Sequence, residues 1–332
     1  MQVEDIKNVA VVGAGTMGHG IGLTFALNGY HVILQDRNEE ILGRAIAQVK
    51  NDLETFAECG IASRDVIQRT LSKIATTTHL REAVKDADFV TEAVTENVEV
   101  KRSIFTNLDA YCPEHTILAS NTSSLTLRDF ASQCKRQEKI LICHWMNPPQ
   151  ILPAVEVAPG ESTSAETMDV ICALLKRVNK APIRMKKEIP GLLHARVQMG
   201  LMREVWSVWQ QGIASPEDID LVVKGGFGLR LAVMGPLQMC DMGGLDIWYT
   251  AANQLFNVIN DAPEPPAELK KLVEAGDLGV KTGKGFFDYE TDSSGKDQGK
   301  TVKERDRVLI NLLKARGDTC LGCERRSGYG QT

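Results

Sequence analysis

The chain has 332 residues, of which 43% are hydrophobic and 24% charged, and its formal net charge is −5. This length exceeds what one hydrophobic core usually organises, so we expect two domains. The mildly acidic balance argues against binding to nucleic acid or to an anionic membrane surface, and no apolar run approaches the roughly 20 residues of a membrane-spanning helix.

The N-terminal part of the sequence has the pattern of a dinucleotide-binding unit. Residues 8–12 form a short run that is apolar from Val9 onward, as expected for a central parallel strand that is buried on both faces. A helical pattern then runs to Gly29, and a second strand is predicted over 31–36. A glycine motif lies between the first strand and the helix, and the residues that we expect to contact a cofactor there are Gly13, Gly15, Thr16, Met17 and Gly18.

The G-x-G-x-x-G spacing of this motif has a physical cause. Gly13 permits a tight turn, Gly15 lets the backbone approach a pyrophosphate, and Gly18 allows the helix to pack closely on the strand. Asp36 ends the second strand, where a carboxylate hydrogen-bonds a ribose 2′-hydroxyl and repels a 2′-phosphate, so NAD is favoured over NADP. The adjacent Arg37 argues the other way, because an arginine there accommodates that phosphate. A glycine-rich turn without a ligand is the structural alternative.

Four more strands are predicted over 73–78, 88–94, 116–121 and 139–145, with helical stretches between them. This alternation indicates an α/β fold with a parallel, doubly wound sheet, a Rossmann domain, whose ligands bind at the carboxyl ends of the strands. Three polar clusters follow successive strands at that edge. Their members are Glu96, Asn97, Lys101, Asn121, Ser123 and Asn147.

A histidine and a glutamate near the end of this domain form a distinctive pair. His144 lies in the strand predicted over 139–145, and Glu156 follows twelve residues later in an apolar, strand-like run. Oxidation of a secondary alcohol removes a proton from oxygen and a hydride from carbon. Histidine is the natural base near neutral pH, a carboxylate on its other ring nitrogen fixes the tautomer, and NAD accepts the hydride. A purely structural histidine–glutamate pair is the alternative.

The second half of the sequence is helical, so we expect a Rossmann domain over 1–187 and an all-α domain over 188–332. One long helix is predicted over 192–212, and another begins after Ser215 as its N-cap. A polar stretch and a short amphipathic helix around 307–313 precede the C-terminal tail. Apolar side chains at helical spacing on the long helix are expected to form core or dimer interface rather than a binding site, and they include Leu201, Val205 and Trp209.

A series of different motifs is spread over most of the chain. They are GAGTMGHGIG, TEAVTENVEVKRSIF, SNTSSL, HWMNPP and VEV in the first half, and SPEDIDLVVKGGFGLR, MGPLQMCDMGGLDI and GVKTGKGFFDY in the second. In order and spacing they resemble the 3-hydroxyacyl-CoA dehydrogenase family, which includes L-gulonate 3-dehydrogenase (lambda-crystallin) and carnitine dehydrogenase. The resemblance covers residues 7–290. It implies an NAD-binding Rossmann domain, a helical domain that forms a homodimer, and a substrate bound between the two domains.

The resemblance also implies roles for individual residues. His144 corresponds to the catalytic histidine of the family, Glu156 to its carboxylate partner, and Ser123 to a serine that hydrogen-bonds the reacting hydroxyl or carbonyl group. A turn serine is the alternative for Ser123, and a solvated helix face is the alternative for Lys101. The residues expected around the cofactor and the substrate are Glu96, Lys101, Asn121 and Asn147.

Three departures from the family pattern concern the substrate. Ala195 stands where the helical domain usually opens with an asparagine that touches the reacting group, and the adjacent His194 is expected to face elsewhere. A proline before the glutamate strand resembles the gulonate and carnitine branches. The acyl-CoA enzymes carry a lysine-rich helix that holds the CoA phosphates, whereas this chain has acids in the corresponding segment, where they would repel phosphate; these acids are Asp52, Glu54 and Glu58.

The motifs GPLQMCDMGGLDI and KTGKGFF resemble the acyl-CoA branch, so both substrate classes stay open. We favour a small free L-3-hydroxy acid over its CoA thioester, with Arg230 as a partner for the substrate carboxylate. Two other interpretations are a dehydrogenase for an unusual cyclic or aromatic alcohol, which Ala195 would permit, and a non-catalytic, NAD-binding protein of crystallin type.

Cysteine usage and the N-terminus bear on the cellular compartment. The eight cysteines are scattered, and only Cys320 and Cys323 have the spacing of metal ligands, without the second pair that a tetrahedral zinc site needs. We therefore expect no metal, free thiols and a reducing, cytoplasmic location. The N-terminal residues are acidic and lead directly into a strand, so no signal peptide is expected.

Overall fold

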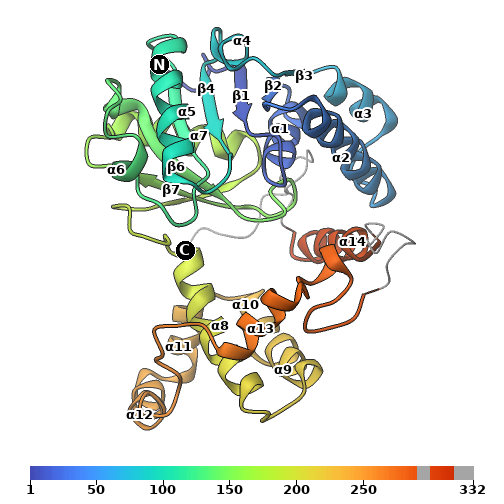
Figure 1. Ribbon diagram of the computed structural model, residues 1–332, viewed down its shortest axis with the longest axis vertical. Coiled ribbons are helices and arrows are strands. Elements are labelled where there is room, and N and C mark those ends of the chain that lie inside the picture. The colour runs from blue at the N-terminus through green and yellow to red at the C-terminus, as the bar shows by residue number, and fades with distance from the viewer. Residues whose placement is uncertain (290–299, 318–332) are drawn as a thin grey trace. The chain divides into compact units, whose positions relative to one another are not determined.

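The computed structural model describes residues 1–289 and 300–317, and the chain divides into two compact units (Figure 1). The first unit comprises Met1–Ala195 together with the chain from Arg305 on, and the second comprises Arg196–Glu304. The sequence places the boundary a few residues earlier, after 187, and assigns the C-terminal helix to the second domain, whereas that helix packs with the first unit. The CLGC segment lies outside the described residues.

The first unit is built around one eight-stranded sheet in the order β3-β2-β1-β4-β5-β6-β7-β8. The strands β1 to β6 pair in parallel, which confirms the predicted doubly wound sheet. β7 is antiparallel to β6, and β8, a short strand that the sequence does not suggest, is parallel to β7. The strands are β1 (Asn8–Val12), β2 (His31–Gln35), β3 (Ile74–Thr77), β4 (Phe89–Glu92), β5 (Ile117–Ser120), β6 (Ile140–Trp145), β7 (Ala154–Pro159) and β8 (Ala181–Arg184).

Helices lie on both faces of this sheet (Figure 1). Several begin at a residue whose side chain accepts a hydrogen bond from the first turn, as Asn97 does from the N–H of Val100 at 3.0 Å. These caps fix where each helix starts relative to the preceding strand. The helices are α1 (Gly18–Leu27), α2 (Glu39–Glu58), α3 (Arg64–Leu71), α4 (Leu80–Val84), α5 (Val98–Tyr111), α6 (Leu127–Phe130), α7 (Ala165–Arg177) and α14 (Lys300–Ala315).

Two hydrophobic clusters hold the helices against the sheet, because successive strand residues point to opposite faces. Val9 and Val11 of β1 belong to the cluster that contains Phe25 of α1 and the apolar side of α7. Val12 belongs to the cluster on the other face, with Phe105 of α5 and the apolar sides of α4 and α6. The helices thus bury the flat faces of the sheet, and the carboxyl ends of β1, β4, β5 and β6 carry the polar loops.

A third cluster joins α14 to α2. Ile310 and Leu313 of α14, which are 1% and 8% exposed, pack with Leu53 and Phe56 of α2. An ion pair of 2.6 Å between Arg307 and the glutamate that ends α2 lies beside these contacts. The predicted amphipathic helix around 307–313 is therefore present but longer, and its apolar side covers the second half of α2.

The second unit is helical in its described part, as predicted. The long helix α8 ends shortly before Gly212, which has a φ of +66°, and Ser215 caps α9 by accepting the N–H of Asp218 at 3.2 Å. Arg230 lies on the short helix α10, which follows a π-helical turn, Val223–Gly228. The helices are α8 (His194–Gln210), α9 (Pro216–Val222), α10 (Leu229–Leu231), α11 (Pro236–Gly243), α12 (Leu245–Leu255) and α13 (Ala267–Ala275).

Among residues 1–289 and 300–317, no helix has both the length and the apolar character needed to cross a membrane.

Candidate active site

The turn between β1 and α1 has the form of a dinucleotide-binding cradle. Gly13 has a φ of +97°, a backbone conformation that other residues rarely adopt. A Cβ on Gly18 would lie 1.8 Å from the carbonyl oxygen of Gly13, so only glycine lets α1 begin this close to the strand. A Cβ on Gly15 would meet no atom within 4 Å, which leaves open space in front of the first turn of α1. The N–H groups of such a turn favour a negatively charged group such as a pyrophosphate.

Asp36 lies beside this cradle, immediately after β2. Its Oδ2 accepts a hydrogen bond of 3.0 Å from the backbone N–H of Ala14, and the side chain is half-buried. Thr16 is exposed and Met17 half-buried where α1 begins. The glycine turn and the carboxylate held at the end of the second strand together fit the adenosine and pyrophosphate parts of NAD.

The carboxyl ends of β4 and β5 enclose a buried network around Lys101. Its Nζ lies 2.7 and 3.0 Å from the two carboxylate oxygens of Glu92 and 3.2 Å from Oε2 of Glu96. Ser120 donates to the same Glu92 carboxylate at 2.6 Å. Lys101 is 1% exposed, and the three donors of its ammonium group all have carboxylate partners. The arrangement therefore makes Lys101 a support for Glu96 and rules out the solvated helix face, while its contact with a cofactor stays a prediction.

Glu96 fixes the loop that follows β5. Its Oε1 accepts hydrogen bonds from the hydroxyls of Thr122 (2.5 Å) and Ser124 (2.8 Å) and from the N–H groups of Ser123 (3.1 Å) and Ser124 (3.0 Å). Burial alone would raise the pKa of Glu96, but these bonds and the Lys101 ammonium lower it to about 2. The loop presents the Ser123 hydroxyl at the surface, where it makes no hydrogen bond within the described residues.

His144 and Glu156 face each other across β6 and β7. They are directly paired in the antiparallel register, and Nδ1 of His144 lies 2.7 Å from Oε2 of Glu156. His144 is 7% exposed and Glu156 is fully buried. Because the carboxylate occupies Nδ1, the other ring nitrogen, Nε2, remains available to accept a proton, which is the arrangement of a general base held in one tautomer.

The second oxygen of Glu156 joins this pair to the start of α8. Oε1 accepts the backbone N–H groups of Leu193 and His194, each at 2.8 Å. Burial alone would raise the pKa of Glu156, but the hydrogen bonds from His144 and from these N–H groups lower it. The ring centroid of His194 lies 6.1 Å from that of His144, so the expectation that His194 faces elsewhere is wrong.

The remaining predicted residues of the first unit gather at the same edge of the sheet. Asn121 follows β5, and its Oδ1 accepts the N–H of Trp145 at 2.8 Å, which ties the ends of β5 and β6 together. Asn147 follows β6 and is exposed. Arg230 belongs to the second unit, where it is exposed on α10.

The acids of α2 have a different environment from the one we expected. Asp52 is 5% exposed, lies 3.5 Å from Nε2 of His19 and accepts a hydrogen bond of 3.1 Å from Gln150. It is therefore an interior residue and not a surface charge that repels phosphate, which corrects the prediction. Glu58 pairs with α14, and Glu54 is exposed.

Glu92 is a member of this network that the sequence does not single out. It lies within the apolar strand β4 and is fully buried, as Glu156 is in β7. A carboxylate inside a buried strand needs a partner, and this was the signal that could have identified it, with Lys101 on the following helix as the partner.

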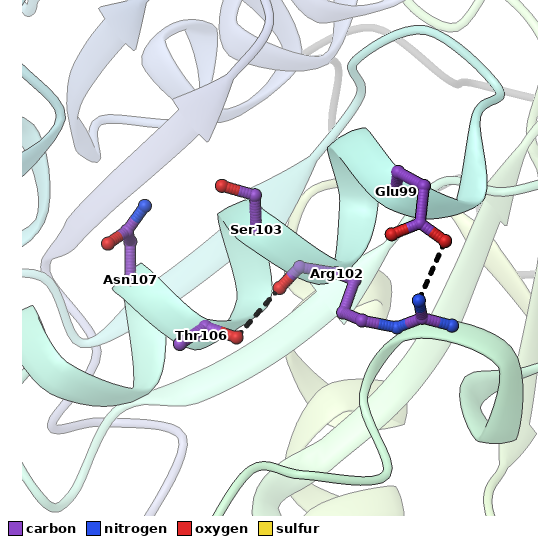
Figure 2. A pocket seen from close by; sticks show the side chains of 5 residues that line it. All are labelled: Glu99, Arg102, Ser103, Thr106 and Asn107. Atoms are coloured by element: carbon purple, nitrogen blue, oxygen red, sulfur yellow. Dashed lines mark hydrogen bonds and ion pairs between the residues drawn. The ribbon is translucent and has the colours of Figure 1, made fainter.

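Figure 2 shows a separate hollow on the surface of α5. Its side chains project from one side of that helix, and an ion pair of 2.7 Å links Glu99 to Arg102. None of the lining residues belongs to the strand-end cluster, so this hollow is not the candidate active site. The lining residues are Glu99, Arg102, Ser103, Thr106 and Asn107.

Comparisons with known proteins agree with this site. The model of the 3-hydroxyacyl-CoA dehydrogenase NAD binding domain matches residues 8–189, and that of the 3-hydroxyacyl-CoA dehydrogenase C-terminal domain matches residues 191–289. The probable 3-hydroxybutyryl-CoA dehydrogenase of Bacillus subtilis is 37% identical over 291 residues, which cover 87% of this chain and 100% of that protein.

A second relative has a different kind of name. The 5-formyl-3-hydroxy-2-methylpyridine 4-carboxylate 5-dehydrogenase of Mesorhizobium japonicum is 30% identical over 310 residues, which cover 93% of this chain and 98% of that protein. A solved structure of a 5-formyl-3-hydroxy-2-methylpyridine 4-carboxylic acid 5-dehydrogenase, described as an NAD+ dependent dismutase, has a TM-score of 0.85 at 30% identity. The match covers 96% of this chain and 100% of the chain in that structure.

The matched NAD-binding region contains the glycine cradle, Asp36 and the His144–Glu156 pair. NAD is therefore the cofactor, and the protein is an oxidoreductase. Since the two models together span the chain from residue 8 to residue 289 and the relatives share at least 30% of their residues with it, the chain belongs to the 3-hydroxyacyl-CoA dehydrogenase family.

Proposed function

We propose that this protein oxidises the hydroxyl group of a small, free L-3-hydroxy acid to the 3-oxo acid, with NAD+ as the oxidant. The observation that carries this proposal is the 2.7 Å contact between Nδ1 of His144 and Oε2 of the fully buried Glu156. A carboxylate in that position serves to hold an imidazole that gains and loses a proton.

The proposed chemistry assigns one task to each side chain. Nε2 of His144 takes the proton of the substrate hydroxyl, and anionic Glu156 stabilises the imidazolium that forms. The Ser123 hydroxyl hydrogen-bonds the same substrate oxygen, on a loop that Glu96 holds. When bound, NAD+ supplies the acceptor for the hydride that leaves the carbon. In the reverse direction His144 returns its proton to the oxo group.

The proposal assigns the cofactor contacts to the strand ends of the first unit. The glycine turn holds the pyrophosphate at the N-terminus of α1, and Asp36 hydrogen-bonds the adenosine ribose. Asn121, at the end of β5, lies beside the nicotinamide part. Asn147 and Arg230 are proposed to contact the substrate, Arg230 through its carboxylate.

The covering of α2 supports a free acid over a CoA thioester. In the acyl-CoA enzymes, as the resemblance implies, the helix after the second strand holds the CoA phosphates. Here Ile310 and Leu313 of α14 cover the second half of that helix, and Asp52 is buried beneath it. α14 lies beyond residue 289, where the family's C-terminal model ends, and 87% of this chain suffices to match the whole of the Bacillus subtilis CoA enzyme.

The test is the appearance of NADH absorbance with L-3-hydroxybutyrate, L-gulonate, L-carnitine and L-3-hydroxybutyryl-CoA as separate substrates. Turnover of a free acid, with the thioester slower, is expected. Turnover of the thioester alone would refute the substrate assignment and leave the chemistry intact. A His144→Gln variant as active as the wild type on every substrate would refute the chemistry.

One observation favours a second substrate class, a hydroxyl or formyl group on an aromatic carboxylate. The relative whose name describes a pyridine carboxylate covers more of this chain, 93%, than the Bacillus subtilis relative does, and the pyridine enzyme structure covers 96% of it. Such a substrate is also a free acid, so the packing of α14 over α2 is equally compatible with it. A pyridine carboxylate that bears a hydroxymethyl group, added to the same assay, separates the two classes.

We also propose a homodimer formed through the helical unit, in a reducing, cytoplasmic compartment. Large apolar side chains are exposed on that unit, among them Val233 (75%), Leu237 (81%) and Val258 (72%), and a subunit interface would bury such side chains. The cysteines of the described residues are free thiols. Sedimentation equilibrium, which should give twice the 36.4 kDa of one chain, tests the dimer.

A further inference from the structure

His194 lies against the proposed catalytic pair, and its position is fixed by that pair. It is the first residue of α8, and its backbone N–H donates to Oε1 of Glu156 at 2.8 Å. The other oxygen of the same carboxylate holds Nδ1 of His144. One buried anion thus fixes the histidine of β6 and the residue that opens α8, and the two ring centroids are 6.1 Å apart with an interplanar angle of 57°.

The imidazole of His194 is open to a ligand. The residue is exposed, and within the described residues its ring nitrogens make no hydrogen bond. His144 likewise has Nε2 available, because the carboxylate of Glu156 engages only its Nδ1. Since a hydrogen bond to oxygen spans about 2.9 Å, two imidazoles this close can bind two neighbouring oxygens of one small molecule that lies against both rings.

The residue after His194, Ala195, leaves the substrate without a hydrogen-bond donor that the family pattern leads us to expect. Ala195 has no polar side chain, although the resemblance leads us to expect an asparagine there that touches the reacting group. An imidazole can donate or accept a hydrogen bond, and it carries a positive charge when protonated. The histidine one residue earlier brings these properties to the same end of α8.

We propose that His194 is a substrate-binding residue that hydrogen-bonds a carboxylate or carbonyl oxygen next to the hydroxyl group from which His144 takes the proton. The inference rests on the proposed function, because it places the substrate at Nε2 of His144. It selects substrates with two oxygen functions on neighbouring or next-neighbouring carbons, as in hydroxy acids and their oxo products. A simple alcohol offers His194 nothing to bind.

The test compares His194→Ala, His194→Gln and the wild type as NADH complexes, titrated calorimetrically with acetoacetate. Truncation to alanine should weaken acetoacetate binding by about tenfold or more, since a hydrogen bond to a charged group is lost. The glutamine variant retains a donor and should recover much of the affinity. The Kd for NADH should not change, because the ring lies outside the glycine cradle, and the backbone N–H to Glu156 remains in every variant.

A matched control is His79→Ala, which removes an exposed histidine that precedes α4 and makes no side-chain cap; it should bind acetoacetate as the wild type does. Equal affinity of His194→Ala and the wild type, whether both bind or neither does, would overturn the proposal. The proposed function fails by a different result, namely wild-type turnover in a His144→Gln variant, so the two failures are distinguishable.

Discussion

His144 and Glu156 are cross-strand neighbours in the antiparallel pair of β6 and β7, with Nδ1 and Oε2 2.7 Å apart. Direct antiparallel partners project their side chains from the same face of the sheet. Residues 146–153, between the ends of the two strands, supply the loop that lets β7 return beside β6. Two residues twelve positions apart in the sequence are thus brought within hydrogen-bonding distance. The pairing of the two strands, rather than either side chain alone, sets the geometry of that contact.

Replacing His144 with glutamine should lower kcat by about 10²–10⁴-fold, the usual contribution of a general base. The Kd for NADH should stay at its wild-type value, because the cofactor cradle lies on β1 and α1. Steady-state kinetics and NADH fluorescence titration measure the two quantities. His115→Gln, which removes an exposed histidine paired with Asp88, is the control and should leave both unchanged.

Glu156→Gln should lower kcat and reduce stability together. The amide cannot stabilise an imidazolium as a carboxylate does, and it weakens the two N–H contacts at the start of α8, so we expect a loss of about 1–3 kcal/mol in the free energy of unfolding. Urea denaturation and steady-state kinetics are the measurements. Wild-type kcat in a variant that is merely less stable would assign Glu156 a structural role only.

Glu96 should make stability depend on pH in the acid range. Its pKa is lowered from 4.5 to about 2 in the folded state, so the folded protein binds this proton less readily than the unfolded chain. The stabilisation is therefore full above the unfolded value and is lost as the pH falls from about 4.5 towards 2. The difference in urea midpoint between the wild type and Glu96→Gln should shrink over that interval. A difference that stays constant down to pH of about 3 would contradict the assignment.

Alanine substitutions at two glycines of the cradle should have different effects on stability and on NADH affinity. Gly18→Ala places a Cβ 1.8 Å from a backbone carbonyl oxygen, so it should lower the melting temperature as well as NADH affinity. Gly15→Ala meets no atom within 4 Å, so it should fold normally and lose NADH affinity, because the methyl group occupies the space proposed for the pyrophosphate. Gly43→Ala, on α2 and equally unobstructed, is the control. Normal NADH binding by Gly15→Ala would place the cofactor elsewhere.

Truncation of the buried α14 side chains should destabilise the first unit. Ile310→Ala or Leu313→Ala removes a large side chain from the contact with Leu53 and Phe56 and should cost about 2–5 kcal/mol in the free energy of unfolding. Leu312, on the same helix and 41% exposed, provides the control, since its replacement by alanine should cost much less. Equal effects of Leu312→Ala and Leu313→Ala would show that α14 does not pack on α2 in solution.

Local sequence patterns correctly predicted those parts of the fold that depend on interactions between residues close together in the chain. The strand predicted over 8–12 is β1 at the same residues, and the glycine motif lies between a strand and a helix. The N-cap at Ser215 was also found as predicted. In each case the deciding interaction joins residues a few positions apart, so the sequence carries the information directly.

The environment of a side chain could not be predicted from the sequence where it depends on residues that are distant along the chain. Asp52 is buried because Gln150, far along the chain, reaches it. His194 faces His144 because Glu156 binds the N–H groups at the start of α8, and helical periodicity does not contain that contact. Lys101 has the pattern of a surface or cofactor lysine, but the buried Glu92 on the neighbouring strand engages it.

The packing of α14 on α2 makes the first unit discontinuous in sequence, with Arg196–Glu304 inserted between its two parts. Synthesis on the ribosome proceeds from the N-terminus, so the helical unit is complete before the last piece of the Rossmann unit emerges. Until then Leu53 and Phe56 lack their contacts with Ile310 and Leu313. The nascent chain therefore carries an uncovered apolar surface on an otherwise folded sheet until α14 has been synthesised and can pack on α2.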